Sequence, residues 1–295
     1  MDILLTGATG FIGSALIPLL VRKNYNITVL TRNITKAEVL FNNYQLNFVK
    51  NLDEFHNLDS FSAVINLAGE PIFDHRWTNK QKQRLIESRI KTTEKLTALI
   101  NQSISPPNCF ISSSATGYYG NCYDQIVTEN IPPKNHFVAQ LCSTWENVAL
   151  QAETRVCLLR TGLVLDNSAG VLAKMLPLYR LGLGGKLGHG KQYWSWIALE
   201  DMISAVLFLL ENKHCYGAFN CTAPTPVTNA EFNHYLGAYL NRPHFINIPA
   251  SVLSLFFGER SHLLLDSQRI FPQKLLQAGF QFKYKNLVAL FNEIL

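Results

Sequence analysis

The sequence has few charged residues and no cluster of one sign. Charged side chains make up 16% of the chain, and 26 Lys and Arg stand against 21 Asp and Glu, a net charge of +5. A nucleic-acid-binding protein concentrates its Lys and Arg in a patch or a run, and this chain spreads them. We therefore expect no nucleic-acid partner, whereas the mild positive surplus suits a small anionic ligand.

Cysteine pairs are also missing. The six cysteines include no CxxC motif, and Cys109, Cys142 and Cys157 lie within apolar segments. Free buried cysteines behave as small hydrophobic residues, and a disulfide framework is typical of short secreted chains. We expect reduced thiols, a cytoplasmic protein and no metal site. A disulfide framework is the alternative.

No hydrophobic run is long enough to predict a membrane span. Residues 3–21 are uncharged, but TGATG at 6–10 interrupts them and Asp2 precedes them. A signal peptide carries positive charge before its apolar core, and a membrane helix needs about 20 apolar residues. We therefore expect no membrane association. Hydrophobic residues make up 47% of the chain, enough for a large core.

Short β-rich runs alternate with amphipathic segments in the first half. Strands are predicted at 2–6, 26–30, 46–49, 61–66, 109–113 and 155–160. Helices are predicted at 11–23, 79–101 and 134–153, the second of them capped by Thr78. This alternation predicts an α/β fold with a doubly wound parallel sheet.

The second half has a different composition. Five glycines within 182–190 lead into YWSW at 193–196, and helices at about 199–211 and 228–240 alternate with short strands. We expect two domains, 1–165 and a smaller α+β domain at 166–295, with some segments of the second returning to the sheet. The 182–197 segment is predicted to be a lid or rim over the substrate. A surface loop anchored by a buried Trp is the alternative.

Three glycines follow the first predicted strand. The run GATGFIG places Gly7, Gly10 and Gly13 between that strand and the next helix. Such glycines allow a tight turn and let the backbone approach a pyrophosphate, whose charge then rests on the helix N-terminus. The GxxGxxG spacing is a weak signal alone, but its place in the first strand-to-helix unit predicts a dinucleotide site. A glycine-rich turn is the alternative.

The end of the second strand selects between the two nicotinamide dinucleotides. An acidic residue there would bind the ribose 2′-hydroxyl of NAD, but the residues are Thr31, Arg32 and Asn33. A guanidinium forms charge-assisted, often bidentate hydrogen bonds with a phosphate. Arg32 therefore favours NADP(H). A solvated surface arginine is the alternative.

Two later strands end in small or hydroxyl residues. The fourth ends in NLAG (66–69), where a cofactor would pass close to Gly69, and the fifth ends in SSSATGYYG (112–120). Hydroxyl groups at the mouth of a central strand can orient a substrate carbonyl or alcohol over a nicotinamide. Serines that only form a turn are the alternative.

These motifs, in this order, resemble the extended short-chain dehydrogenase/reductase superfamily, which contains the nucleotide-sugar epimerases. Further motifs narrow the resemblance to its "epimerase family protein" branch, whose members also carry nucleotide-sugar-epimerase or cell-division-inhibitor names. They are CSTWE (142–146), RTGLVL (160–165), the 182–197 segment, NCTAPTPV (220–227), PQKL (272–275) and GFQF (279–282). The likeness covers nearly the whole chain. One departure is Ala198, where the branch commonly has His.

The resemblance implies an NADP-binding Rossmann domain followed by a substrate domain. The resemblance carries cofactor contacts over to Thr6, Gly7, Gly10, Phe11, Ile12, Thr31, Arg32, Leu67, Ala68 and Glu70. The motif glycines Gly13 and Gly69 belong to the same expected site, and Arg76 and Leu163 are weaker matches. Members often dimerise through helices that include the 79–101 region, so a homodimer is also open.

The resemblance ends at the proton-transfer residues. Extended short-chain enzymes use a Tyr and a Lys four residues later, and these positions fall at about Leu141 and Trp145. Neither side chain titrates, and the apolar stripe of their helix predicts that both lie in the core or a pocket wall. The remaining candidates are Ser114, to orient the substrate, and Tyr119 or Glu146, to move the proton.

Two functions stay open from the sequence. The first is an NADP(H)-dependent oxidoreductase or epimerase that acts on a small substrate such as a nucleotide sugar. The second is a catalytically silent NADP-binding protein that regulates by association, for instance in cell division. The missing Tyr and Lys favour the second, whereas the glycine motif, Ser114 and the aromatic second half favour the first.

Overall fold

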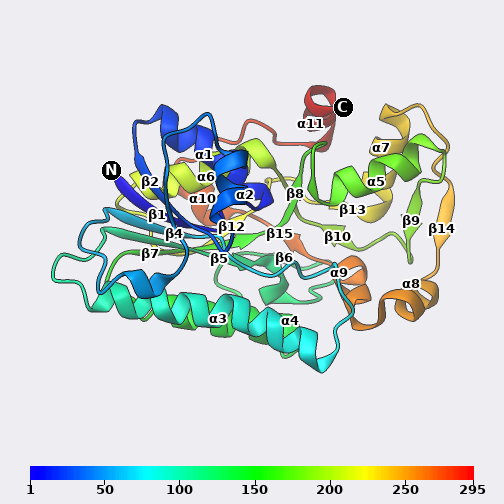
Figure 1. The fold of residues 1–295 in the computed structure, drawn as a ribbon. Coiled ribbons are helices and arrows are strands. Elements are labelled where there is room, and N and C mark those ends of the chain that lie inside the picture. The colour runs from blue at the N-terminus through cyan, green and yellow to red at the C-terminus, as the bar shows by residue number, and fades with distance from the viewer.

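The centre of the molecule is a sheet of seven parallel strands (Figure 1). The computed structural model describes all 295 residues, and the sheet has the order β12-β7-β5-β4-β1-β2-β3. Its strands are β1 (Asp2–Thr6), β2 (Asn26–Leu30), β3 (Asn47–Val49), β4 (Ala63–Asn66), β5 (Cys109–Ala115), β7 (Val156–Thr161) and β12 (Gly217–Cys221). All carboxyl ends therefore meet at one edge. The predicted α/β fold with a doubly wound parallel sheet is confirmed.

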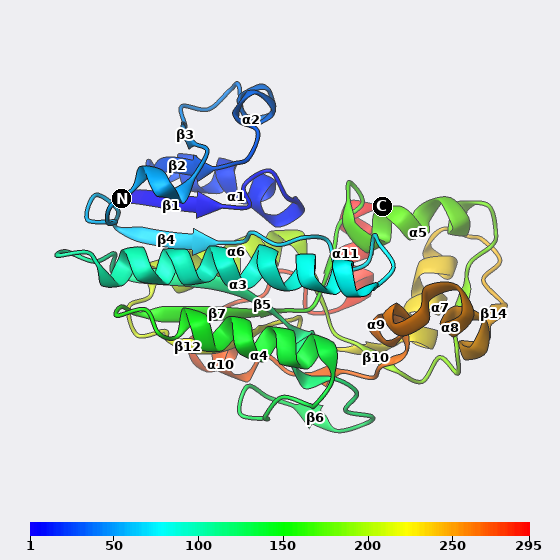
Figure 2. The ribbon, with the colours of Figure 1, turned by 60° about the horizontal axis from the view of Figure 1, so that its bottom comes forward.

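Helices cover both faces of this sheet (Figure 2). One face carries α1 (Phe11–Arg22) and α6 (Leu199–Glu211), and the other carries α3 (Asn79–Asn101) and α4 (Phe137–Ala149). Successive strand residues point to opposite faces, so Leu5 packs toward α1 and α6 whereas Leu4 packs toward α3. The predicted cap of α3 is present, because the Thr78 side chain accepts a hydrogen bond from the N–H of Gln81.

Smaller elements surround the sheet. They are α2 (Ile34–Leu40), the 3-10 helices η1 (Leu52–Glu54) and η2 (Thr116–Tyr119), β6 (Ile126–Val127), β15 (Arg269–Ile270) and α10 (Gln273–Gln277). β15 pairs with β6, and α10 packs against β12. The C-terminal part of the chain thus supplies the edge strand β12 and also β15 and α10, which pack beside the sheet region.

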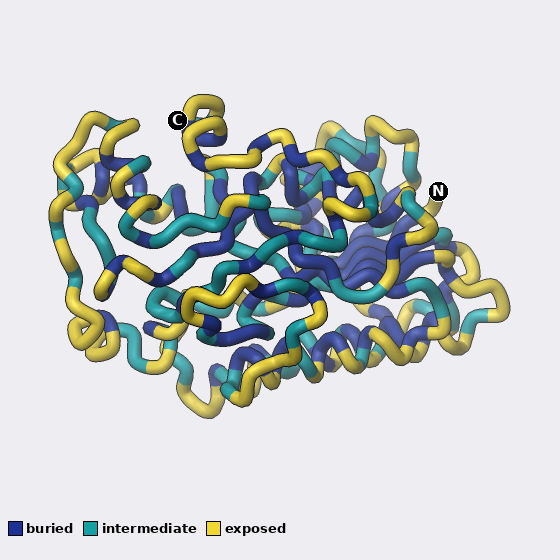
Figure 3. The backbone as a smooth tube through the Cα atoms, turned by 180° about the vertical axis from the view of Figure 1, so that it is seen from behind, coloured by how far each residue is buried: buried dark blue, intermediate teal, exposed yellow.

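A second lobe stands beyond the carboxyl edge of the sheet (Figure 1). It contains β8 (Leu163–Leu165), α5 (Gly170–Arg180), β9 (Gly185–Leu187), β10 (Tyr193–Trp194), β11 (Trp196–Ala198), β13 (Val227–Thr228), α7 (Asn229–Tyr239), β14 (Ile246–Ile248), α8 (Ala250–Phe257), η3 (Gly258–Ser261), α9 (His262–Leu265) and α11 (Leu287–Ile294). Figure 3 shows the buried strands of the sheet as one dense group, whereas this lobe alternates buried and exposed segments.

The predicted lid at 182–197 is wrong. β9 pairs with β14 and β10 pairs with β13, so the segment is built into two small sheets. Trp194 and Trp196 are buried in the core of the lobe, and their indole N–H groups donate to the carbonyls of Leu264 and Thr225. Trp194 and Trp196 therefore fill a core and are not available to cover a ligand, as in the alternative of a buried Trp anchor, whereas Tyr193 is half-buried.

Candidate functional site

The glycine loop between β1 and α1 is closed by backbone contacts that only glycine permits. Gly7 has a φ of +72°, and a Cβ there would lie 2.5 Å from the carbonyl carbon of Leu67. A Cβ at Gly13 would lie 2.3 Å from the carbonyl oxygen of Gly7. Both positions require glycine, because a side chain would push α1 away from β1 and β4. We call residues 7–13 the glycine cradle.

The cradle ends in unpaired backbone N–H groups. Gly10, at the N-cap of α1, offers no side-chain cap, and the first turn has no acidic residue. The first hydrogen bond of the helix runs from Ser14 N–H to Gly10 O, so the N–H groups of Phe11, Ile12 and Gly13 have no helical partner. Such N–H groups, together with the helix dipole, suit a phosphate.

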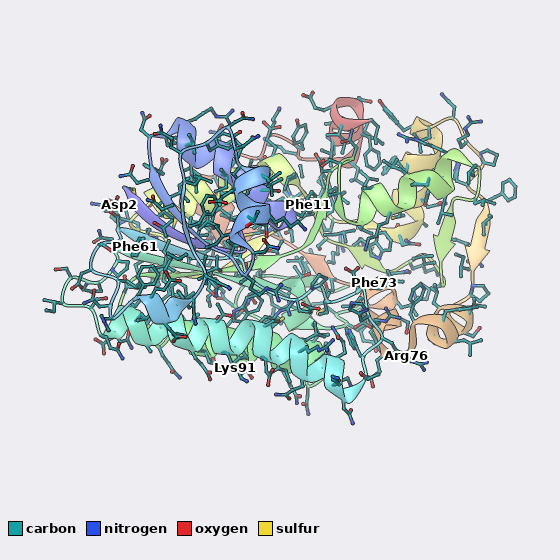
Figure 4. The ribbon with its side chains drawn as sticks, in the orientation of Figure 1. Asp2, Phe11, Phe61, Phe73, Arg76 and Lys91 are labelled. Carbon is teal, nitrogen blue, oxygen red and sulfur yellow. The ribbon has the colours of Figure 1, made fainter.

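A cavity of about 400 Å³ opens beside the cradle. It lies between the two lobes, where Figure 4 labels Phe11. The Phe11 ring packs so closely on Gly170, at the start of α5, that a Cβ there would meet it at 2.9 Å. The lining residues are Thr9, Gly10, Phe11, Ser14, Ala15, Ser168, Ala169 and Leu199. The open space and the free N–H groups fit the pyrophosphate of a dinucleotide.

Thr31 and Arg32 lie at the same edge, directly after β2. Arg32 is exposed and takes part in none of the ion pairs of the structure, which leaves its guanidinium free for an anionic ligand. Asn33 caps α2 by accepting a hydrogen bond from the N–H of Lys36. The segment thus presents a cation and no carboxylate.

The end of β4 forms the opposite wall of the cradle. Thr6 Oγ1 donates to Asn66 Oδ1 at 2.6 Å and accepts from the N–H of Ala68 at 3.2 Å. Leu67 touches Gly7, as described above, and the carbonyl of Glu70 accepts from Arg89 Nη2 at 2.9 Å. Gly69 lies against this same arginine, since a Cβ there would meet the Arg89 guanidinium at 3.3 Å.

Residues 71–78, in the connection from β4 to α3, form a strap that is tied to the second lobe. Asp74 pairs with Lys174 of α5 at 2.8 Å, and the carbonyl of Phe73 accepts from Arg260 Nη1 at 2.7 Å. Arg76 is exposed on this strap, well apart from Phe11 in Figure 4. The structure therefore does not bring Arg76 to the cradle. Leu163, the other weaker match, begins β8 beside Trp196 of β11.

A buried hydrogen-bond network lies at the carboxyl ends of β5 and β7. Ser114 Oγ donates to Glu146 Oε1 at 2.6 Å. Arg160 holds the same carboxylate through two bonds of 2.8 Å, from Nε to Oε1 and from Nη2 to Oε2. Each of these three residues is only 4% exposed. Ser114 and Arg160 are register partners on neighbouring strands, so both side chains point to the face where α4 supplies Glu146.

Tyr119 belongs to this network and has no exposed surface. Its hydroxyl donates to Asn220 Oδ1 and accepts from Arg160 Nη1, both at 2.7 Å. Burial raises the pKa of Tyr119 well above its usual value, although Arg160 acts in the opposite direction. The Tyr119 hydroxyl is therefore protonated at neutral pH and fully used by protein partners.

Leu141 and Trp145 are both buried, as their positions in the apolar stripe predict. Trp145 Nε1 donates to Thr93 Oγ1 of α3 at 2.9 Å, and Thr93 Oγ1 also accepts from Asn66 Nδ2. The hydrogen bond from Trp145 to Thr93 ties α4 to α3. Neither Leu141 nor Trp145 has a side chain that could exchange a proton with a substrate.

Sequence reasoning missed Arg160 and Asn220. Both stand near the carboxyl ends of buried strands, where an otherwise apolar run ends in a polar residue: VCLLR for Arg160 and AFN for Asn220. A charged residue in such a strand must be paired, because an isolated buried charge is costly. The sequence could therefore have indicated that Arg160 has a buried partner, but it does not identify which residue that partner is.

The sheet and the cradle define a dinucleotide-binding α/β protein of the Rossmann type. The model of the NAD dependent epimerase/dehydratase family matches residues 3–222, and the chain belongs to that family. Residues 248–294 match a further family described as a domain of unknown function, DUF1731.

Curated relatives match over nearly the whole chain. The Arabidopsis thaliana "Epimerase family protein SDR39U1 homolog, chloroplastic" is 38% identical over 97% of this chain and 84% of its own length. The Mycobacterium leprae "Epimerase family protein ML0860" is 40% identical over 96% of this chain and 92% of its own length. The expected membership of the "epimerase family protein" branch of the extended short-chain superfamily is confirmed.

Solved structures share the full fold. Human epimerase family protein SDR39U1 (isoform 2), crystallised with NADPH, has a TM-score of 0.91 and 33% identity, covering 100% of this chain and 99% of that one. A nucleoside-diphosphate sugar epimerase from Corynebacterium glutamicum has a TM-score of 0.78 and 27% identity, covering 100% of this chain and 58% of that one.

None of the helices of the present structure combines the length and apolar character that a membrane crossing needs.

Proposed function

We propose that the chain is an NADP(H)-dependent oxidoreductase or epimerase that moves a proton through Ser114 and Glu146. The observation that carries this proposal is the 2.6 Å hydrogen bond from Ser114 Oγ to Glu146 Oε1, at the edge of the sheet that also holds the glycine cradle. The substrate class is a small secondary alcohol or ketone, such as the sugar of a nucleotide sugar.

The cofactor we propose is NADP(H). The free N–H groups of the cradle would hold its pyrophosphate, and the exposed guanidinium of Arg32 would pair with its 2′-phosphate. The NADPH in the human relative supports this assignment. The remaining contacts that we propose come from the cradle, from the ends of β1, β2 and β4, and from the start of β8: Thr6, Gly7, Gly10, Phe11, Ile12, Gly13, Thr31, Leu67, Ala68, Gly69, Glu70 and Leu163.

We place the substrate in the crevice between the lobes. Residues 1–165 then form the cofactor side and residues 166–295 the substrate side, with β12 and α6 of the second part completing the sheet. This division follows the cavity beside Phe11, whose walls come from both parts.

The residues of the network can move a proton without a Tyr–Lys pair. The bound dinucleotide would supply or accept the hydride. When a substrate alcohol is oxidised, its O–H bond breaks and the proton passes to Ser114 Oγ, while the Ser114 proton passes to the Glu146 carboxylate. In the reverse direction Glu146 returns its proton through Ser114 to the carbonyl oxygen. In an epimerisation both halves occur in one cycle, so the proton count returns to its starting value.

Tyr119 contributes by holding this network in place. Its hydroxyl lies between Arg160 and Asn220, which occupy it on both sides, and the residue has no exposed surface. A buried phenol with a raised pKa is a poor proton acceptor at neutral pH. We therefore propose that Tyr119 acts through Arg160 and that Ser114 is the residue that meets the substrate.

The test is a turnover screen with matched variants. Alcohols, ketones and nucleotide sugars are incubated with the protein and NADP(H), and NADPH absorbance and epimerised product are measured. Ser114→Ala and Glu146→Gln should each lower kcat by about 10²- to 10⁴-fold. NADPH affinity should not change in either, because neither residue lies in the cradle. Glu153→Gln, at an exposed position near the end of α4, is the control. Full turnover in both site variants would refute the assignment.

A second candidate function rests on Leu141 and Trp145. Because both positions of the usual proton-transfer pair are filled by buried side chains, the chain would act as an NADP(H)-binding regulatory protein without turnover. Tight NADPH binding together with no turnover across the whole screen would favour this function. A product detected for any substrate, and lost in Glu146→Gln, would exclude it.

A further inference from the structure

Arg160 is the centre of the buried network. Its Nε and Nη2 hold the carboxylate of Glu146, and its Nη1 donates to Tyr119 OH at 2.7 Å and to the main-chain carbonyl of Glu129 at 2.9 Å. The guanidinium also lies 3.7 Å from the centroid of the Tyr118 ring. Contacts on several sides therefore fix both the position and the plane of this side chain.

The register of the sheet builds this arrangement. Ser114, Arg160 and Asn220 are neighbours on β5, β7 and β12, so their side chains emerge from one face in a row. Asn220 accepts from Tyr119 and donates through Nδ2 to the carbonyl of Phe271 at 3.1 Å. The row thus holds Arg160 from one side with Tyr119, while Ser114 stands on its other side.

The charge of Arg160 decides what Glu146 can do. The Glu146–Arg160 ion pair is buried, with both side chains 5% exposed. Removing the cation from a buried ion pair favours the neutral form of the carboxylate that is left behind. Glu146 in that form would already carry the proton that the relay has to accept. The protonated carboxyl of Glu146 would then be able to donate the hydrogen bond to Ser114 Oγ, which reverses its direction.

We infer that Arg160 is the positioning residue of the proton relay, which keeps the Glu146 carboxylate ionised and turned toward Ser114. Its catalytic consequence rests on the proposed function, whereas its control of the Glu146 charge does not. Tyr119, Asn220 and the carbonyl of Glu129 hold Arg160 in place and do not exchange the proton.

Infrared spectroscopy tests the charge directly, with no substrate needed. At neutral pH, Arg160→Met should show a protonated carboxyl band that is absent from the wild type and from the double variant Arg160→Met/Glu146→Gln. Arg155→Met is the matched control. Arg155 donates to main-chain carbonyls of Leu209, Leu210 and Cys215, so its loss should produce no such band.

Arg160→Lys covers the case in which Arg160→Met does not fold. Lysine keeps the charge but loses the two-bond fork. The infrared band of protonated Glu146 is identified as the band that is lost in Glu146→Gln. This band should appear at a higher pH in Arg160→Lys than in the wild type. In turnover, kcat should fall at least about 10-fold with KM and NADPH affinity unchanged, because only the geometry of the relay is affected.

Two results would overturn the inference. One is a folded Arg160→Met whose spectrum at neutral pH shows no protonated carboxyl, and the other is an Arg160→Lys variant with an unshifted Glu146 band. The failure of the proposed function is a different result: NADPH binds, no substrate turns over, and the Glu146 band still shifts. That outcome would support the control of the Glu146 charge by Arg160 and refute the relay.

Discussion

The glycine cradle and the proposed proton relay lie at the same edge of the same sheet, but they are built from different parts of the chain. The cradle consists of main-chain atoms from one segment, residues 7–13, packed against the end of β4. The relay consists of side chains from β5, α4 and β7, supported from β12. A main-chain site depends on the absence of side chains, whereas a side-chain site depends on the fold that brings its members together. A substitution in the cradle should therefore change NADPH binding, and a substitution in the relay should change turnover without changing NADPH binding.

The largest effect expected is on turnover, in the relay. Ser114→Ala and Glu146→Gln should each reduce kcat by about 10²- to 10⁴-fold, and the double variant should be no worse than the poorer single one, because the two residues pass one proton as a unit. Steady-state kinetics of the three variants measures this, with NADPH titrations showing an intact cradle. Additive losses would mean that the two residues act in separate steps.

A smaller effect is expected on cofactor binding, in the cradle. Gly7→Ala should weaken NADPH binding by about 100-fold, since the added Cβ meets the Leu67 backbone at a positive φ and strain of about 3 kcal/mol results. Fluorescence titration of NADPH gives the affinity. Gly258→Ala is the control, because Gly258 also has a positive φ but has open space around it. Equal NADPH affinity in Gly7→Ala and Gly258→Ala would contradict the role of the close approach.

Arg32 extends the comparison to a side chain beside the cradle. Arg32→Ala should lower NADPH affinity by about 1.5–3 kcal/mol, as expected for hydrogen bonds to a charged group, and leave NADH affinity almost unchanged. Calorimetric titration with both dinucleotides measures the difference. Arg22→Ala, at an exposed arginine near the end of α1, should change neither. A wild type that binds NADH and NADPH equally would refute the selectivity.

The smallest effect concerns Tyr119 and the stability of the folded chain. Tyr119→Phe should lower the free energy of unfolding at pH 8 by about 2 kcal/mol, because two buried hydrogen bonds are lost, one of them to a charged group. Burial raises the folded pKa of Tyr119 above the usual value of about 10, so its proton favours the folded state and this contribution declines as pH rises above about 10. Urea unfolding should therefore show a smaller loss of stability between pH 8 and pH 11 in Tyr119→Phe than in the wild type.

Local signals predicted most of the sheet region. The strands at 2–6 and 26–30 and the helix at 79–101 have the bounds expected, because apolar periodicity and the Thr78 cap are encoded within each segment. The helix expected at 134–153 is shorter, from Phe137 to Ala149, since the chain is still extended at His136. The cradle was visible for the same reason, as its glycines follow one another within seven residues.

The relay was only partly visible in the sequence. Ser114 and Glu146 could be named as candidates, but Arg160 could not, because its partners lie 14 and 41 residues away and meet it only through the register of β5, β7 and α4. The lid at 182–197 failed for a related reason. Glycines and aromatic residues describe a flexible or an anchored segment equally well, and only the packing of Trp194 and Trp196 decides between them.

The late position of β12 in the sequence also affects folding during synthesis. The sheet receives this strand, residues 217–221, only after the ribosome has made α5, β9 and α6. Until then β7 has an unpaired edge, and the hydroxyl of Tyr119 lacks its acceptor on Asn220. A nascent chain that stops near residue 165 would present this open edge to other chains, a known route to aggregation. The sheet is therefore completed only when β12 pairs with β7, and Asn220 gains its partner on Phe271 later still.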